Sequence, residues 1–178
     1  MSKKLHLWCW SDAKPGYINQ DIIKFPWVDL VFDLDNFPYP FDENSLDEVY
    51  SAHVLEHVTD LGQVMEELTR ICKSGAQIKV IVPYFSNPGT RADYTHKRWF
   101  TTGTFAYFHP DFPYNHNAKI AVKSYRIHFF WNRKVFLRSA PINWIPDFFI
   151  NLFPRVYERF FAYIFPSAEI HYLLEVIK

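Results

Sequence analysis

A helix-like segment that leads directly into a short apolar segment constrains the fold of this chain more than any other feature. The apolar positions of the first segment recur at the spacing of one helix face; they are Leu61, Val64, Met65, Leu68, Ile71 and Cys72. Asp60 and Gln63 stand where a capping box begins a helix, and Gly75 is the expected C-terminal stop. Residues 78–82 are bulky and mostly β-branched, and Pro83 follows them. The pair therefore predicts a helix followed by a strand buried on both faces of a parallel sheet.

Other strand-like runs lie on both sides of this pair. Four precede it, separated by turn signals, and cover residues 5–9, 17–22, 28–34 and 47–52. After it, we expect a short helix at 102–108 and strands at 123–131 and 169–177. This succession predicts a doubly wound, mostly parallel, Rossmann-like α/β sheet with right-handed crossovers.

Composition limits the chain to one domain and a narrow set of partners. The 178 residues are 49% hydrophobic, which is enough for a single folded domain over residues 1–178. Nineteen basic and nineteen acidic residues give a net charge of zero, so no nucleic acid partner is expected. Cys9 and Cys72 lie in expected core segments, and neither a secretion signal nor a membrane span is visible. We therefore expect a cytoplasmic protein.

Ligands of an open parallel sheet bind at the carboxyl ends of its strands. Asp21 lies at the end of the second expected strand and is suited to hold two ribose hydroxyls, while Asp33 lies at the end of the third. His53 and His57 flank Glu56 after the fourth, but their order is not the HExxH arrangement of zinc sites. Capping and core packing explain these histidines better, and we expect no metal.

Several segments, in order and spacing, resemble a class I S-adenosylmethionine-dependent methyltransferase, closest to compact relatives with a Leu-Glu-His-Val motif. The segments are LHLWCW, PGYINQDI, VDLVFDLDNFPYPFDENSLDEVY, SAHVLEHV and MEELTRICKSGAQIKVIVPYF, with AEIHYLLEVIK as the last strand. The resemblance covers about residues 3–108. It implies an antiparallel last strand, S-adenosylmethionine as the cofactor, and methyl transfer to an oxygen or nitrogen of a small-molecule or sugar-like acceptor.

The same resemblance implies the site residues. Those expected to contact the cofactor are Leu7, Trp8, Cys9, Trp10, Asp21, Asp33, Leu34, His53, Glu56 and His57. Asp93, Arg98 and Trp99 are expected to bind the acceptor within a substrate-loop region at 86–116. His96 is the candidate general base, because a near-neutral imidazole can take a proton from an acceptor hydroxyl. The alternative is a loop histidine that only contacts Asp93.

One departure from the family pattern bears on activity. The family's first loop is glycine-rich because the cofactor lies against bare backbone there. Here Trp8 and Trp10 occupy the corresponding positions. A second hypothesis is therefore a methyltransferase-like pseudoenzyme or binding module that has lost its cofactor.

An aromatic segment at 142–166 is broken by prolines and is expected to form broken helices. We interpret it first as an inserted lid packed over the end of the sheet. A dimer contact and a peripheral membrane contact are the alternatives, since Arg155 and Arg159 could face anionic headgroups while the rings are buried.

Overall fold

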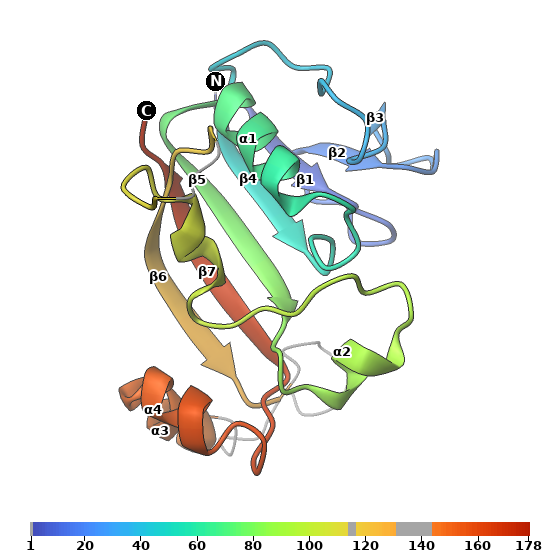
Figure 1. The fold of residues 1–178 in the computed structure, drawn as a ribbon. Helices are drawn as coiled ribbons and strands as arrows, with labels where there is room; N and C mark the ends of the chain where they lie inside the picture. Colours follow the sequence, from blue (N-terminus) through green and yellow to red (C-terminus); the bar gives the residue numbers. More distant parts are fainter. Residues whose placement is uncertain (1, 114–116, 131–143) are drawn as a thin grey trace.

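The computed structural model describes residues 2–113, 117–130 and 144–178. Within them, strands form one seven-stranded sheet of order β3-β2-β1-β4-β5-β7-β6 (Figure 1). The strands are β1 (Lys4–Leu7), β2 (Ile18–Asp21), β3 (Leu30–Val31), β4 (Leu46–Ala52), β5 (Cys72–Pro83), β6 (Ile120–His128) and β7 (Glu169–Val176). The helices are α1 (Leu61–Ile71), α2 (Pro88–Ala92), the 3-10 helix η1 (Thr104–Phe108), α3 (Trp144–Leu152) and α4 (Pro154–Phe160).

The pairing confirms the expected topology. The strands β3, β2, β1, β4 and β5 are parallel, and β7 pairs antiparallel with both β5 and β6. The strand order reverses around β1, whose neighbours are β2 and β4. The carboxyl ends of β1, β4 and β5 therefore meet at one edge of the sheet, where open α/β sheets bind ligands.

The helix α1 forms as the apolar spacing predicts. Its N-cap Asp60 accepts a hydrogen bond from the backbone N–H of Gln63 at 3.1 Å. The buried face includes Val64, Met65 and Leu68, and this face packs against the sheet (Figure 1). The burial of these side chains, more than helix propensity, holds the helix in place.

The prediction that Gly75 stops this helix is wrong. The helix ends at Ile71, and Cys72 already begins β5. Gly75 has φ +79° inside β5, where the register against β4 shifts. Glycine is needed there because the irregular stretch of strand requires a left-handed residue.

Three other boundaries differ from expectation. β3 has only two residues instead of the run 28–34, and β6 begins at Ile120, three residues before the expected start. Residue 131, the expected end of that strand, lies outside the described residues. The expected helix at 102–108 is the 3-10 helix η1. The helix α2 was not predicted; its N-cap Asn87 accepts from the N–H of Gly89.

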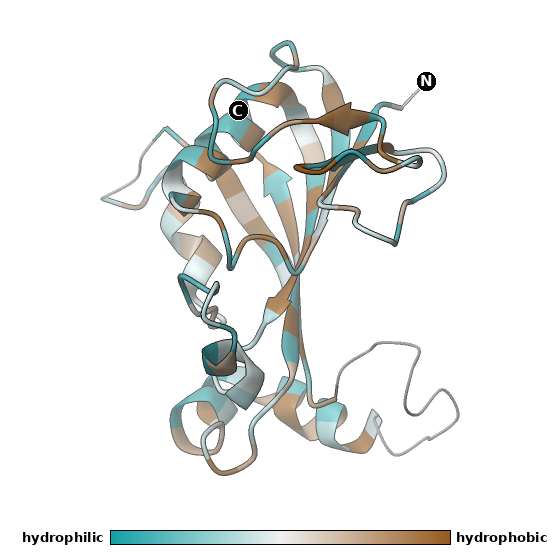
Figure 2. Ribbon diagram, turned by 90° about the vertical axis from the view of Figure 1, so that its right-hand side faces the viewer, coloured by the Kyte–Doolittle hydropathy of each residue, from teal (hydrophilic) through white to brown (hydrophobic). Residues whose placement is uncertain are grey.

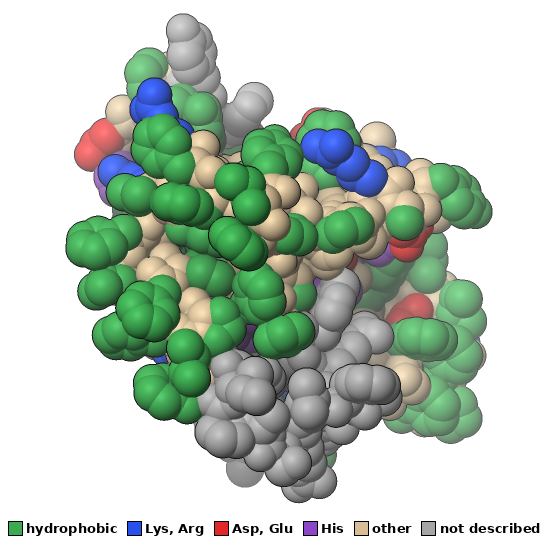
Figure 3. Space-filling model, turned by 90° about the horizontal axis from the view of Figure 1, so that it is seen from below, with side chains coloured by type: hydrophobic (Ala, Val, Ile, Leu, Met, Phe, Trp, Pro, Cys, Tyr) green, Lys and Arg blue, Asp and Glu red, His purple; other side chains and the backbone are tan. Residues whose placement is uncertain are grey.

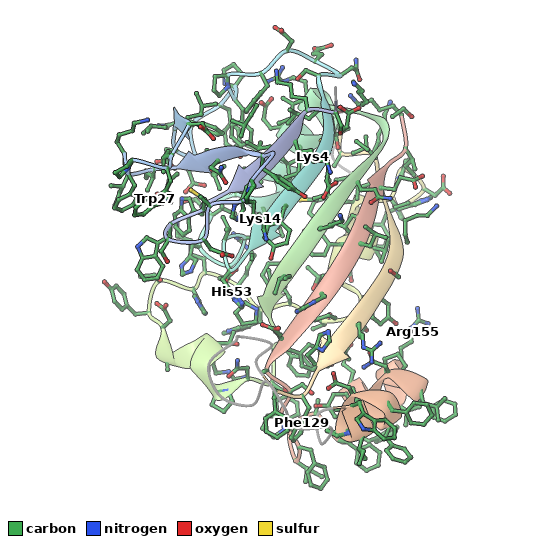
Figure 4. The ribbon with its side chains drawn as sticks, turned by 180° about the vertical axis from the view of Figure 1, so that it is seen from behind. Lys4, Lys14, Trp27, His53, Phe129 and Arg155 are labelled. Atoms are coloured by element: carbon green, nitrogen blue, oxygen red, sulfur yellow. The ribbon has the colours of Figure 1, made fainter. Side chains whose placement is uncertain are left out.

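One face of the sheet carries no helix among the described residues, as the views from front and back show (Figures 1 and 4). Charged side chains cover part of it instead. Glu48 accepts contacts from Lys4, Lys79 and Tyr17. Burial alone would raise the pKa of Glu48, but these partners lower it to about 2. A shallow groove of about 600 Å³ crosses this face between Lys79 and His128.

The aromatic segment forms two helices, as predicted. The helices α3 and α4 are separated at Phe153, directly before Pro154. Hydrophobic positions recur along both (Figure 2). The expected packing of the rings over the sheet is wrong, because Phe148, Phe149 and Phe160 are exposed. Asp147, Asn151 and Glu158 contact the rest of the protein instead. Residues 142 and 143 lie outside the described residues.

No helix in the described ranges is long and apolar enough to cross a membrane.

Candidate functional site

Three loops meet at the carboxyl edge of the sheet, and contacts among three aromatic rings join them. Trp8 follows β1, His57 lies in the loop after β4, and His96 lies in the loop after β5. The ring centroids of Trp8 and His57 are 5.3 Å apart, and those of His57 and His96 are 4.7 Å apart. The structure therefore brings together three of the predicted site residues from distant parts of the chain.

The first loop keeps the backbone conformation that glycine favours. Trp8 has φ 49° and Trp10 has φ 34°, both in the left-handed region. The indole of Trp10 is 67% exposed, and Trp27 donates its indole N–H to the carbonyl of Trp10. Trp27 lies at the β2 side of the molecule (Figure 4). The loop thus turns as a glycine-rich loop can, and the side chain of Trp10 does not fill the edge of the sheet.

The side chain of Trp8 is more buried than that of Trp10. Its indole is half-buried against the core and against His57. The indole Nε1 is buried without a hydrogen-bond acceptor among the described residues. An unmet buried donor costs about 1–3 kcal/mol, and an oxygen of a bound ligand would supply the missing acceptor. The loop is therefore compatible with a cofactor that has Trp8 as part of the wall around it.

Asp21 lies beside this loop at the end of β2. Its two carboxylate oxygens accept from the backbone N–H groups of Trp10 at 2.9 Å and Ile23 at 3.0 Å. The side chain is only 5% exposed. A carboxylate oxygen accepts more than one hydrogen bond, so both oxygens keep a free acceptor position. A ribose contact by Asp21 stays a prediction with suitable chemistry.

Four other residues predicted around the cofactor differ in burial: three are buried in the core, and Asp33 is half-buried. The side chains of Leu7 and Leu34 are buried in the core, and so is Cys9, so only their backbones could face a ligand. Asp33 is half-buried and accepts from the N–H of Asp35 at 2.9 Å. An adenine contact near Asp33 stays a prediction.

His53 holds two carboxylates at the end of β4. Its Nδ1 lies 3.5 Å from Glu56 and its Nε2 lies 3.3 Å from Glu169. Burial alone lowers the pKa of His53, but the two carboxylates outweigh burial and raise it to about 9. This imidazolium, directly after the carboxyl end of β4 (Figure 4), therefore neutralises the negative charge of Glu56 and Glu169.

A hydrogen-bond chain orients His57. Thr95 donates its hydroxyl to Asp93 at 2.6 Å, and its Oγ1 lies 2.9 Å from Nδ1 of His57. Because the hydroxyl hydrogen goes to the carboxylate, Nδ1 of His57 is the donor to Thr95. Burial lowers the pKa of His57 and favours the neutral ring. The lone pair is then on Nε2.

His96 has the same arrangement. Its Nδ1 lies 3.0 Å from the carbonyl of Thr90. A carbonyl only accepts, so Nδ1 carries the hydrogen and Nε2 of the neutral ring keeps its lone pair. Nε2 lies 3.6 Å from Asp93, which also bears out the expected contact between these two residues. His96 can thus accept a proton at Nε2.

The predicted acceptor-binding residues differ in the contacts that their side chains already make within the protein. Arg98 donates to the carbonyls of Leu55 at 2.8 Å and Thr59 at 2.9 Å, so its guanidinium ties two loops together. Trp99 is exposed and lies under the guanidinium of Arg91. Acceptor contacts by Asp93, Arg98 and Trp99 stay predictions.

The sequence interpretation missed the two threonines that orient the histidines. Thr95 stands two residues after Asp93, a spacing at which an aspartate side chain accepts from the following backbone. That turn was visible in the sequence, and it forms, since the N–H of Thr95 donates to Asp93 at 2.9 Å. Thr90 gave no such signal, because it acts through its backbone carbonyl.

One group of side chains has the donor types of a metal site. Ligand atoms of Glu56, His57 and His96 lie within 4.8 Å of one another. However, the His53 imidazolium already lies beside Glu56 at 3.5 Å. We therefore assign no metal to these three residues.

Comparison with known proteins agrees with this geometry. Residues 12–80 match the family model of a methyltransferase domain, and the match begins directly after the loop of Trp8 and Trp10. The sheet order and the antiparallel β7 are those expected from the resemblance. The fold of this chain is that of class I methyltransferases. No curated protein matches its sequence.

Solved methyltransferases superpose over nearly the whole chain. An S-adenosylmethionine-dependent methyltransferase of Archaeoglobus fulgidus is 16% identical with a TM-score of 0.60, covering 98% of this chain and 86% of that one. One from Mesorhizobium loti is 13% identical with a TM-score of 0.55, covering 97% and 90%. Phosphoethanolamine N-methyltransferase 2 of Haemonchus contortus, solved with S-adenosyl-L-methionine, is 12% identical with a TM-score of 0.56, covering 99% and 48%. These likenesses concern the fold.

Proposed function

We propose that this chain transfers a methyl group from S-adenosylmethionine to an oxygen or nitrogen of a small-molecule or sugar-like acceptor. The observation that carries the proposal is the position of the Trp8–His57–His96 ring cluster. It lies at the carboxyl edge of a methyltransferase-type sheet, beside the buried carboxylate of Asp21. That edge is where sheets of this class bind ligands.

Asp21 and the loop 8–10 would hold the cofactor. The free acceptor positions of Asp21 suit two ribose hydroxyls, and the unmet indole N–H of Trp8 suits a ligand oxygen. The bound cofactor supplies an electrophilic methyl group whose bond to sulfur breaks as its bond to the acceptor forms. The reaction depends mainly on in-line alignment of the two groups.

His96 would take the proton that the acceptor loses. Its Nδ1 is fixed by the carbonyl of Thr90, so the lone pair on Nε2 has a defined direction. Asp93 lies on the Nε2 side at 3.6 Å and would stabilise the imidazolium that forms. His57, held by Thr95, packs its ring against that of His96 and limits how far the base can turn.

The pseudoenzyme hypothesis rests on Trp8. The left-handed backbone at Trp8 and Trp10 and the exposed indole of Trp10 weaken this hypothesis, because the loop has kept its turn. The methyltransferase-domain match does not favour it either. We retain it as the outcome that the binding experiment below would reveal.

The first experiment measures binding of S-adenosylhomocysteine by calorimetry. We expect micromolar affinity for the native chain and at least about tenfold weaker binding for Asp21→Asn. Asp29→Asn is the matched control, since Asp29 also accepts from the backbone of β2 but is exposed. If only a Trp8→Gly version binds, Trp8 closes the site and the pseudoenzyme hypothesis is correct. If neither version binds, the cofactor site is misplaced.

The second experiment follows a labelled methyl group from the cofactor into a panel of hydroxyl and amine acceptors. We expect His96→Ala to lower kcat by about 100-fold or more while binding of S-adenosylhomocysteine is unchanged. If the variant has the same kcat as the native chain, His96 is not the general base. The rate would then depend on the alignment of cofactor and acceptor alone.

A cytoplasmic location also stays a proposal. Its support is the pair of buried cysteines, Cys9 and Cys72, which are both free thiols as a reducing compartment would keep them.

A further inference from the structure

Three polar side chains of α3 and α4, those of Asp147, Asn151 and Glu158, contact the rest of the protein. Asp147 accepts from Nδ1 of His128 and from the N–H of Phe129, both at 2.8 Å. Asn151, one turn later, accepts from the N–H of Ile127 at 2.8 Å and donates to its carbonyl at 2.7 Å. Hydrogen bonds therefore join the end of β6 to the polar side of α3.

Hydrogen bonds also join α4 to the rest of the protein. Glu158 accepts from the N–H of Thr102 at 2.8 Å and from the hydroxyl of Tyr84 at 2.9 Å. The hydroxyl of Tyr157 contacts Ser167 at 2.7 Å. Both acidic residues of the segment 144–165, Asp147 and Glu158, are thus engaged on the inner side.

The outer side of the two helices is apolar, and the two exposed charges of the segment are both positive. We call it the aromatic face; its largest members are Trp144, Phe148, Phe149, Phe153, Phe160 and Phe165, all exposed. Seen from below, hydrophobic side chains gather over this part of the molecule (Figure 3). The exposed charges of the segment are Arg155 and Arg159, one turn apart on α4. In Figure 4, Arg155 lies on the β6 side of the two helices.

This arrangement is the reverse of an ordinary surface helix. Surface helices turn their apolar stripe inward and their charges to water. An exposed apolar area of this kind marks an interaction surface. Its charges are all positive, so two copies of the face would bring like charges together, which a self-complementary dimer contact avoids. Aromatic rings with arginines and no exposed acid suit an anionic lipid surface.

We propose that the aromatic face binds the surface of an anionic phospholipid bilayer, with α3 and α4 lying in the plane of the interface. β6 runs parallel to β5, so α3 and α4 follow a strand that ends at the same edge of the sheet as the candidate site. Docking would therefore hold that edge near the membrane. The proposal is independent of methyl transfer, because it rests only on α3 and α4.

The test is co-sedimentation of the full chain with vesicles of phosphatidylcholine, with or without phosphatidylglycerol. We expect binding only to the vesicles that contain phosphatidylglycerol, and its loss at high ionic strength. Phe149→Ser with Phe153→Ser, and separately Arg155→Gln with Arg159→Gln, should each weaken binding by at least about tenfold. All four side chains are exposed, so the fold is expected to survive.

Ile22→Ser with Ile23→Ser is the matched control. It removes two exposed apolar side chains after β2, near the opposite end of the sheet order, and should leave vesicle binding unchanged. Three results would overturn the proposal. They are no binding to either vesicle, equal binding to both, and a native dimer, measured by light scattering, that becomes a monomer in the phenylalanine variant.

Discussion

Nε2 of His53 lies 3.3 Å from a carboxylate oxygen of Glu169, so the residue directly after β4 meets the first residue of β7. The contact crosses β5, which separates these strands in the sheet. It therefore couples the part of the chain that carries the candidate cofactor loop to the antiparallel C-terminal strand.

This ion pair makes stability depend on pH. The pKa of His53 rises from 6.5 to about 9 in the folded protein. A raised folded-state pKa gives stability that is fully present below pH 6.5 and is lost as the pH rises through about 9. We expect His53→Asn to lower the free energy of unfolding by about 2–3 kcal/mol at pH 6 and by much less at pH 10.

Urea unfolding at several pH values measures this difference. Asparagine suits the variant because His53 has φ 57°, a conformation that asparagine tolerates. His109→Asn is the control, because the side chain of His109 is 43% exposed and its Nδ1 lies 3.5 Å from the exposed Asp111. A destabilisation of His53→Asn that stays constant from pH 6 to 10 would contradict the assignment of the charge.

Trp10 carries a backbone strain that glycine would remove. Its φ of 34° is unfavourable for a residue with a Cβ by about 1–2 kcal/mol, and its exposed indole contributes little burial. We expect Trp10→Gly to be more stable than Trp10→Ala by about 1 kcal/mol, after allowing for the greater freedom of glycine in the unfolded chain. Chemical denaturation of the two variants shows directly which of them has the larger free energy of unfolding. An alanine variant of equal or higher stability would show that the loop relaxes out of the left-handed region.

Much of the sheet could be predicted from the sequence because its signals are local. The apolar spacing of α1, the Asp60 cap and the run ending at Pro83 each depend on a few neighbouring residues. Gly75 misled the prediction because a left-handed glycine serves a helix end and an irregular strand equally well. The two conformations differ only in the pairing of β5 with β4, which is not a local property.

The sequence indicates candidate site residues but not their contacts. Trp8, His57 and His96 are candidates from the sequence, but their ring contacts depend on three loops that come together only in the folded sheet. Burial of Leu7 and Leu34 follows from the same packing. The aromatic segment was misread because apolar residues are normally buried; the inward polar contacts of Asp147 and Glu158 reverse that expectation.

Glu158 fixes α4 to the protein, and its loss should loosen the aromatic face. Its carboxylate accepts from the N–H and hydroxyl of Thr102 and from the hydroxyl of Tyr84. We expect Glu158→Gln to cost about 1–3 kcal/mol, because an amide offers one acceptor oxygen in place of two. Amide hydrogen exchange should quicken in residues 144–165. Glu43→Gln, at an exposed carboxylate, is the control, and equal exchange in both variants would show that apolar contacts alone hold α4.

The two thiols report on the loop that carries the candidate cofactor site. Burial raises the pKa of Cys72 to about 12, and burial together with nearby Asp21 raises the pKa of Cys9. Both thiols should therefore react with Ellman's reagent at pH 8 much more slowly in the native protein than after denaturation. Cys9 lies between the two left-handed tryptophans, so its labelling in the native protein requires the loop to leave Asp21, whose carboxylate holds the N–H of Trp10. If Cys9 is labelled slowly and S-adenosylhomocysteine slows the labelling further, the ligand lies against this loop. Fast labelling of Cys9 in the native chain would contradict the closed turn of residues 8–10.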